Sequence, residues 1–217
     1  GFETTLPVYA LLIKRAYEEN LGNIRVLLSV KSLLPALYWI CENGPGIDGF
    51  IGPGHVSTII GSGAYEPLCR KSGIPLAVSG FGYEQIIAAV YDLLVQNKKK
   101  TCFVHNLYPN AVAYGGNTAA MSVISEYFVK KPSFWRGIGE IMDSGYFLSE
   151  KYKQFDGGSE IGAGETKNSA CLCGSVIIGR ARPTDCVFFG KACTPENPLG
   201  PCMVSSEGTC GIWHANM

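Results

Sequence analysis

The chain has 217 residues, of which 47% are apolar and 17% are charged, and its 18 basic residues balance its 18 acidic ones. This composition is typical of a folded globular protein and excludes a disordered chain. A net charge of zero argues against a surface built for nucleic acid or for anionic lipid. Since no apolar stretch reaches the roughly 18 residues of a membrane helix, no membrane partner is expected either.

Short apolar runs alternate with longer amphipathic segments over the first hundred residues, and turn signals separate them. The predicted strands are 24–30, 49–52 and 74–78. The predicted helices are 6–19, 32–41, 57–71 with an interruption near 61–63, and 83–96. Strands that alternate with helical segments indicate βαβ units, so the expected fold class is α/β, with a parallel sheet flanked by helices. The helix at 6–19 would follow a strand lying before Gly1, so the chain is expected to begin within a fold.

The pattern changes after about residue 106. Residues 117–130 predict a helix, and FWRGIGEI at 134–141 predicts an extended segment. The polar, glycine-rich segment 151–164 is interpreted as a passage into a different kind of structure. We therefore expect an α/β body over 1–156, incomplete at its N-terminus, and a small cysteine-rich domain over 157–217.

Six of the nine cysteines lie in the last 48 residues. These tail cysteines are Cys171, Cys173, Cys186, Cys193, Cys202 and Cys210. A segment with so few apolar runs cannot bury enough surface to fold by itself, so its sulfurs are expected to hold it together. Disulfides, a zinc site and an iron–sulfur cluster all remain open, because the spacings match neither the usual zinc pairs nor either ferredoxin pattern.

The other three cysteines are Cys41, Cys69 and Cys102, and each has apolar neighbours. They are interpreted as small buried hydrophobic residues. Unpaired buried thiols fit a reducing compartment better than a secreted disulfide scaffold, so a cytoplasmic location is expected.

Several segments resemble the HypD family of hydrogenase maturation factors. In the tail, the resemblance runs through CLCG at 171–174, DCVFFGK at 185–191, CTPE at 193–196 and GPCMVSSEGTC at 200–210. Upstream, GFETT at 1–5, GPGHVS at 52–57 and WRGIG at 135–139 are similar to the family as well. The resemblance therefore covers nearly the whole chain.

The resemblance implies a [4Fe–4S] cluster held as in ferredoxin:thioredoxin reductase. That family pattern has four cysteines separated by 14, 6 and 16 residues, and Cys171, Cys186, Cys193 and Cys210 have those gaps here. These four are the expected metal and cofactor ligands, with Cys173 as an alternative to Cys171. Cys173 and Cys202 would then be free thiols near the cluster and candidates for redox chemistry.

The family also has an earlier domain, with a CGTH cysteine that holds iron and a CPVC pair for thiol chemistry. Neither motif occurs in this sequence, so the chain is expected to be the central and C-terminal portion only, unable to support maturation alone. The function implied is an iron–sulfur scaffold of [NiFe]-hydrogenase maturation that assists assembly of the Fe(CN)2CO group with HypC-type and HypE-type partners. It would be a scaffold with a redox role rather than a turnover enzyme.

Two other functions remain open: a cluster-dependent thiol–disulfide oxidoreductase and a zinc- or disulfide-stapled structural module. Two residues outside the tail are further candidates for the site. His55 opens a predicted helix after a strand and Glu3 precedes another helix, so each has an ordinary local role as a turn or N-cap residue. The resemblance makes both of them candidate cleft residues.

Overall fold

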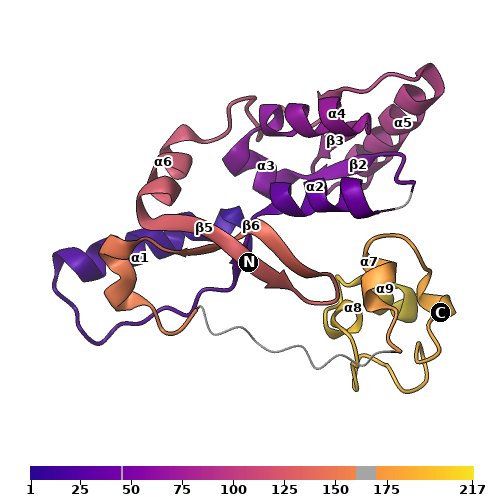
Figure 1. Ribbon diagram of the computed structural model, residues 1–217. Coiled ribbons are helices and arrows are strands. Elements are labelled where there is room, and N and C mark those ends of the chain that lie inside the picture. Colours follow the sequence, from indigo (N-terminus) through magenta and orange to yellow (C-terminus); the bar gives the residue numbers. More distant parts are fainter. Residues whose placement is uncertain (45, 160–169) are drawn as a thin grey trace. The chain divides into compact units, whose positions relative to one another are not determined.

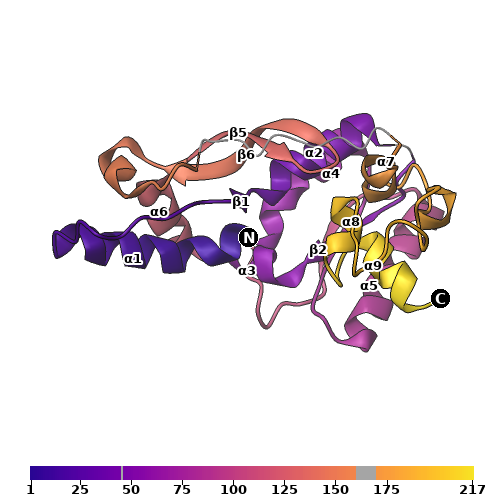
Figure 2. The ribbon, with the colours of Figure 1, turned by 90° about the horizontal axis from the view of Figure 1, so that it is seen from below.

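The computed structural model describes residues 1–44, 46–159 and 170–217. The chain divides into two compact units. One comprises residues 1–38, 47–133 and 142–161, and the other comprises 39–46, 134–141 and 162–217. Figure 1 and Figure 2 show the elements of both units in two views. No helix in the described part of the chain is long and apolar enough to cross a membrane.

The first unit contains the predicted parallel sheet. Its three strands are β2 (Phe50–Pro53), β3 (Leu76–Ser79) and β4 (Val104–Asn106), in the order β2-β3-β4. Both pairings are parallel, with Gly52 opposite Val78 and Val78 opposite Asn106. The central strand is buried along its whole length, as expected for a strand with neighbours on both edges. The mixed α/β architecture with a helix-flanked parallel sheet is thus confirmed, although β4 was not predicted, because its three residues show no strand pattern.

Helices connect and flank these strands (Figure 1). They are α3 (Gly54–Ile60), α4 (Glu66–Ser72) and α5 (Tyr83–Lys99), with a short 3-10 turn η2 (Ser62–Tyr65) between α3 and α4. Helix α2 (Leu33–Asn43) precedes β2 in the chain. The predicted interruption near 61–63 is confirmed. Gly61 has a φ of 83°, and a Cβ there would lie 2.3 Å from the carbonyl oxygen of Tyr114, so only glycine fits at the break.

A second, antiparallel sheet in the chain was not predicted. It has the order β1-β6-β5, formed by β1 (Val30–Lys31), β6 (Gly139–Leu148) and β5 (Phe128–Trp135). Val30 pairs with Tyr146. The predicted strand 24–30 is therefore wrong in extent, because only Val30 within it belongs to a strand. Val26 forms an isolated bridge to Asp156 instead.

Two boundaries after residue 106 also differ from the prediction. Helix α6 (Thr118–Tyr127) ends three residues early, and β5 begins at once with the buried Phe128. The extended segment predicted at 134–141 is the tip of a hairpin, with a turn at 136–138 between β5 and β6. Gly137 in the turn and Gly139 at the start of β6 have φ values of 81° and 115°, a conformation that favours glycine.

The predicted helix at 6–19 is confirmed as α1 (Leu6–Glu18), preceded by the 3-10 turn η1 (Glu3–Thr5). Its buried residues Leu6, Ala10 and Ile13 pack with Tyr127 and Tyr152 in the core of this unit. Residues 150–155 form the 3-10 helix η3 (Glu150–Phe155). The predicted passage 151–164 is described as far as residue 159, and its remainder lies outside the described residues.

The second unit holds the cysteine tail in short elements. These are α7 (Cys173–Ile177), the 3-10 turn η4 (Pro183–Asp185), α8 (Pro201–Val204) and α9 (Thr209–Ala215). Helices of four to seven residues are too short to be stable alone, so the packing around the sulfurs must hold them.

Candidate cysteine cluster site

The six tail cysteines converge on one small core. Cys173, Cys193, Cys202 and Cys210 are buried, and Cys171 and Cys186 pack against them partly buried. The apolar side chains among them are Val176, Phe189 and Met203, with the partly buried Leu172, Ile177, Ala181, Phe188 and Leu199 around them. This core therefore consists largely of sulfur atoms enclosed by a thin apolar layer.

Short helices and turns bring these cysteines together. Cys173 begins α7, Cys202 lies in α8, and Cys210 lies in α9. Cys186 directly follows η4. Cys193 is reached through a tight turn in which Gly190 has a φ of 65° and Phe189 bridges to Cys193.

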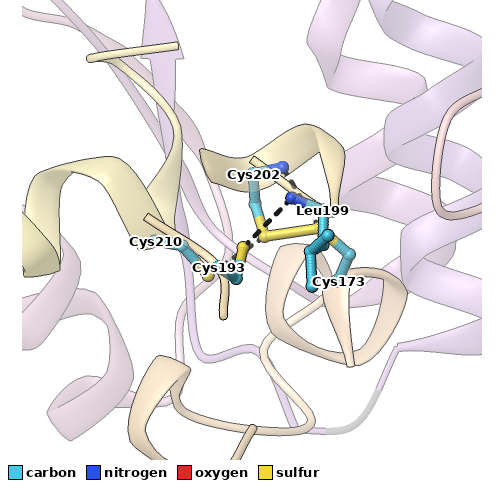
Figure 3. The surroundings of a disulfide bond; sticks show 5 residues. All are labelled: Cys173, Cys193, Leu199, Cys202 and Cys210. Atoms are coloured by element: carbon cyan, nitrogen blue, oxygen red, sulfur yellow. Dashed lines mark hydrogen bonds between the residues drawn. A yellow bond between two sulfur atoms is a disulfide. The ribbon is translucent and has the colours of Figure 1, made fainter. Parts of the chain in front are cut away.

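Cys173 and Cys202 form a disulfide, with their Cα atoms 6.0 Å apart (Figure 3). This differs from the expectation that both are free thiols near the cluster. The bond joins α7 to α8, and the Cys202 amide also donates a hydrogen bond of 3.1 Å to the Cys173 sulfur. Cys171 lies outside this disulfide, and its place in the set of four ligands stays a prediction.

The four remaining tail cysteines lie within electrostatic reach of one another. The pKa of Cys210 is raised to about 11 by burial and by the charges of Cys193, Cys186 and Cys171. The pKa of Cys171 is raised by burial, a hydrogen bond from the Cys173 backbone lowers it, and the charges of Cys186 and Cys193 raise it. Four thiolates are unfavourable together in an apolar core unless a cation compensates them. The arrangement therefore favours a bound, positively charged group.

Backbone groups and one neighbouring sulfur also contact this set. The Leu199 amide donates to the Cys193 sulfur over 3.4 Å (Figure 3). The Cys210 sulfur lies 3.0 Å from the Cys202 sulfur. A Cβ on the buried Gly200 would lie 2.7 Å from the sulfurs of both Cys171 and Cys173. Sequence reasoning missed Leu199 and Gly200, since a backbone amide or a missing Cβ leaves no motif of its own.

The donor set is compatible with a metal cluster. Among the described residues, no group of three or more His, Cys, Asp or Glu side chains is placed to hold a single metal ion. A [4Fe–4S] cluster places each thiolate on a different iron, so its ligands stand farther apart than those of one ion. Four unbonded cysteines around a sulfur-rich apolar core are the chemistry that such a cluster requires.

Glu3 lies in the other unit and is buried, with only 1% of its surface exposed. Its Oε1 accepts hydrogen bonds from the Ser32 hydroxyl at 2.8 Å and from the Leu33 amide at 3.0 Å. Its Oε2 has no hydrogen-bond partner among the described residues. Burial and the Glu3 charge raise the pKa of Tyr146 to about 12. Burial also raises the pKa of Tyr65 to about 12; a hydrogen bond with Ser57 lowers that pKa, and the Glu3 charge adds to the increase. In this structure Glu3 anchors the start of α2, and its role as a cleft residue stays a prediction.

His55 is exposed at the start of α3, and its ring packs at a tilt on Phe81 with 4.3 Å between the centroids.

The three cysteines of the body differ in burial. Cys69 is buried, as predicted, whereas Cys41 and Cys102 are only partly buried. The Cys102 thiol donates a hydrogen bond to the Cys69 carbonyl. Burial raises the pKa of Cys102, although an interaction with the Cys69 side chain lowers it.

The comparisons with known proteins point in one direction. The HypD family model, described as "Hydrogenase formation hypA family", matches residues 1–217. The chain is similar to the hydrogenase maturation factor HypD of Azotobacter vinelandii, with 39% identity over 99% of this chain and 59% of that protein. It is 38% identical to the HypD of Cupriavidus necator, over 99% of this chain and 60% of that protein. The HypD of Rhodobacter capsulatus is also 38% identical, with 98% and 59% covered. The chain thus spans about three fifths of the length of these relatives.

Proposed function

This chain belongs to the HypD family of hydrogenase formation proteins, and from that premise we propose that it is an iron–sulfur accessory protein of [NiFe]-hydrogenase maturation. The observation that carries the proposal is the cysteine core. Cys171, Cys186, Cys193 and Cys210, which the family spacing selects, are also the four tail cysteines left outside the disulfide. When bound there, a [4Fe–4S] cluster supplies one-electron transfer.

The residues of the tail have separate roles in this proposal. The four thiolates hold the cluster, and each must lose its proton to do so. Met203, Phe189 and Val176 keep water away from the sulfurs, and the Leu199 amide stabilises negative charge on Cys193. Burial and hydrogen bonds to sulfur are the two means by which a protein adjusts a cluster potential.

We further propose that the chain takes part in assembly of the Fe(CN)2CO group, together with HypC-type and HypE-type proteins. The support for this step is family membership and the names of the relatives. In that role the iron that carries the cyanide and carbon monoxide is cargo, and the tail cluster is a separate, resident group.

A second candidate function is a cluster-dependent thiol–disulfide oxidoreductase. The observation that favours it is the Cys173–Cys202 disulfide, whose Cys202 sulfur lies 3.0 Å from the Cys210 sulfur. Reduction would break the sulfur–sulfur bond with two electrons and two protons, leaving one thiol on each cysteine. A low-potential one-electron donor protein would supply the electrons in two successive transfers.

The first experiment measures iron and acid-labile sulfide in protein prepared without oxygen. About four of each per chain are expected, because that is the content of a cubane cluster. Cys193→Ala should abolish both, whereas Cys69→Ala, a change at a buried cysteine of the other unit, should leave them unchanged. Zinc alone in protein made with ample iron would refute the cluster assignment.

The second experiment separates the two functions. The chain is joined to the portion of the Azotobacter vinelandii relative that it does not cover, and the fusion is introduced into a strain lacking its own HypD protein. Restored hydrogenase activity that Cys193→Ala removes would support the maturation role. A fusion that binds the cluster fully and reduces its disulfide with reduced viologen, but restores no hydrogenase activity, would instead favour the oxidoreductase.

A further inference from the structure

Helix α5 leaves most of its surface uncovered. Of its 17 residues, only Ala89 and Gln96 are buried. Four large side chains spaced by four, four and three residues form one exposed face, which we call the α5 stripe. The stripe consists of Tyr83, Ile87, Tyr91 and Leu94, which are 73%, 63%, 68% and 63% exposed, flanked by Ile86 and Val90 at 42% and 44%. An apolar helix face normally packs against another surface.

The stripe carries no exposed charge over its central turns. The one charged residue there, Asp92, is turned to the other side of the helix. Its carboxylate pairs with the His105 ring at 2.5 Å and accepts a hydrogen bond of 2.7 Å from Gln96. The charges of the face lie at its two ends instead, with Glu84 in the first turn and Lys98 and Lys99 in the last. A partner for this face must therefore be apolar in its middle, with a positive charge beside the Glu84 end of α5 and a negative charge beside the Lys98 and Lys99 end.

A second copy of the same helix has that pattern. We propose that the α5 stripe is a homodimer interface, in which two copies of this chain pair their α5 helices antiparallel. With the pair centred between Val90 and Tyr91, Ile87 of each copy lies opposite Leu94 of the other. The same contact then occurs twice, which is the isologous arrangement of a two-fold dimer.

The helix ends match in the same register. Lys98 of each copy comes opposite Tyr83 of the other and beside Glu84, whose carboxylate accepts a hydrogen bond from the Tyr83 hydroxyl at 3.0 Å. The ammonium group of Lys98 can therefore meet both an aromatic ring and a carboxylate. Antiparallel pairing also places the positive end of one helix dipole beside the negative end of the other.

The area is sufficient for a weak but specific dimer. The six side chains are 42–73% exposed, two of them are aromatic residues that bury roughly 150–250 Å² in full, and together they would bury at most about 600 Å² per copy. Two copies then bury at most about 1,200 Å², which is the lower limit of specific interfaces. This inference is independent of the cluster and of the proposed function.

The test is sedimentation velocity of the whole chain under reducing, oxygen-free conditions, over about 1–100 µM, the range suited to an interface of this size. A monomer–dimer equilibrium is expected. Ile87→Asp should weaken it at least tenfold, because it places two carboxylates in the apolar contact. Val8→Asp is the matched control, since Val8 is 68% exposed on α1, and should change nothing. A monomer at every concentration, or a dimer that Ile87→Asp leaves intact or Val8→Asp dissociates, overturns the proposal.

Charge reversal tests the antiparallel register. Glu84→Lys should weaken the dimer by placing like charges at both ends, and adding Lys98→Glu should restore it. Failure of this rescue, with native circular dichroism in both variants, overturns the antiparallel pairing. All of the changed side chains are exposed, so the variants are expected to fold.

Discussion

An alanine at Gly200 is expected to disrupt the cysteine site through its sulfur atoms. Gly200 has a φ of −136°, which any residue adopts, so backbone strain plays no part. The added Cβ would lie 2.7 Å from the sulfurs of Cys171 and Cys173, whereas non-bonded atoms of this kind prefer roughly 3.5–4.0 Å. Cys173 is held by its disulfide to Cys202. The sulfur of Cys171 must therefore move by about 1 Å, and overpacking of this size costs about 1–3 kcal/mol.

That cost falls on one of the four proposed ligands, so cluster binding should weaken by about 5- to 150-fold. The assay is iron and sulfide content after oxygen-free reconstitution, with the visible absorbance recorded on the same samples. Gly22→Ala controls for the Gly-to-Ala change itself, since a Cβ at Gly22 meets no atom within 4 Å. Gly179→Ala controls for destabilising the tail, because its φ of 79° strains the backbone while its Cβ meets no atom within 4 Å. Both controls should keep their iron. Full iron content and unchanged absorbance in Gly200→Ala would refute the placement of a ligand at Cys171.

Three further predictions concern stability. Glu3→Ala should lower the free energy of unfolding by about 2–5 kcal/mol, because the buried Ser32 hydroxyl and the partly buried Leu33 amide lose their acceptor. Glu3→Gln should cost less, and equal urea midpoints for the two variants would contradict this. The pKa of Asp156 is raised by burial, but hydrogen bonds from a neighbouring serine and backbone amides outweigh this and hold it below 3.8. Its stabilising effect is therefore present above pH 3.8 and lost as the pH falls through the lower folded value, and Asp156→Asn should remove that part of the pH dependence of the urea midpoint. Finally, chelating the iron should expose the tail to protease beyond about Gly157 before the body is cut, and equal protection of the two parts would argue against a tail stabilised by its cluster.

Much of the body could be predicted from local pattern. The spacing of apolar residues indicated α1, α2 and α5, and the glycines near 61–63 marked where a helix had to break. Alternation of strands and helices indicated the parallel sheet. These features depend on the periodicity of apolar residues and on backbone conformation, and residues close together in the sequence determine both.

The antiparallel sheet could not be predicted in the same way. Val30 pairs with Tyr146 across more than a hundred residues, and such pairing leaves only a faint local signal. Phe128 continues the apolar spacing of the preceding helix, yet it begins a strand because burial in the sheet outweighs helix propensity.

In the tail, too, some features could be predicted from the sequence and others could not. Cysteine content and family spacing together selected Cys171, Cys186, Cys193 and Cys210, because the identity of a ligand resides in its side chain. The disulfide between Cys173 and Cys202, the amide of Leu199 on a sulfur and the space left by Gly200 depend on which turns pack against which. The amino-acid sequence alone determined the kind of chemistry available, because it fixes which side chains carry a thiol group. Only the tertiary structure decided which sulfurs bond to each other and which stay free, because that choice depends on distances between segments far apart in the sequence.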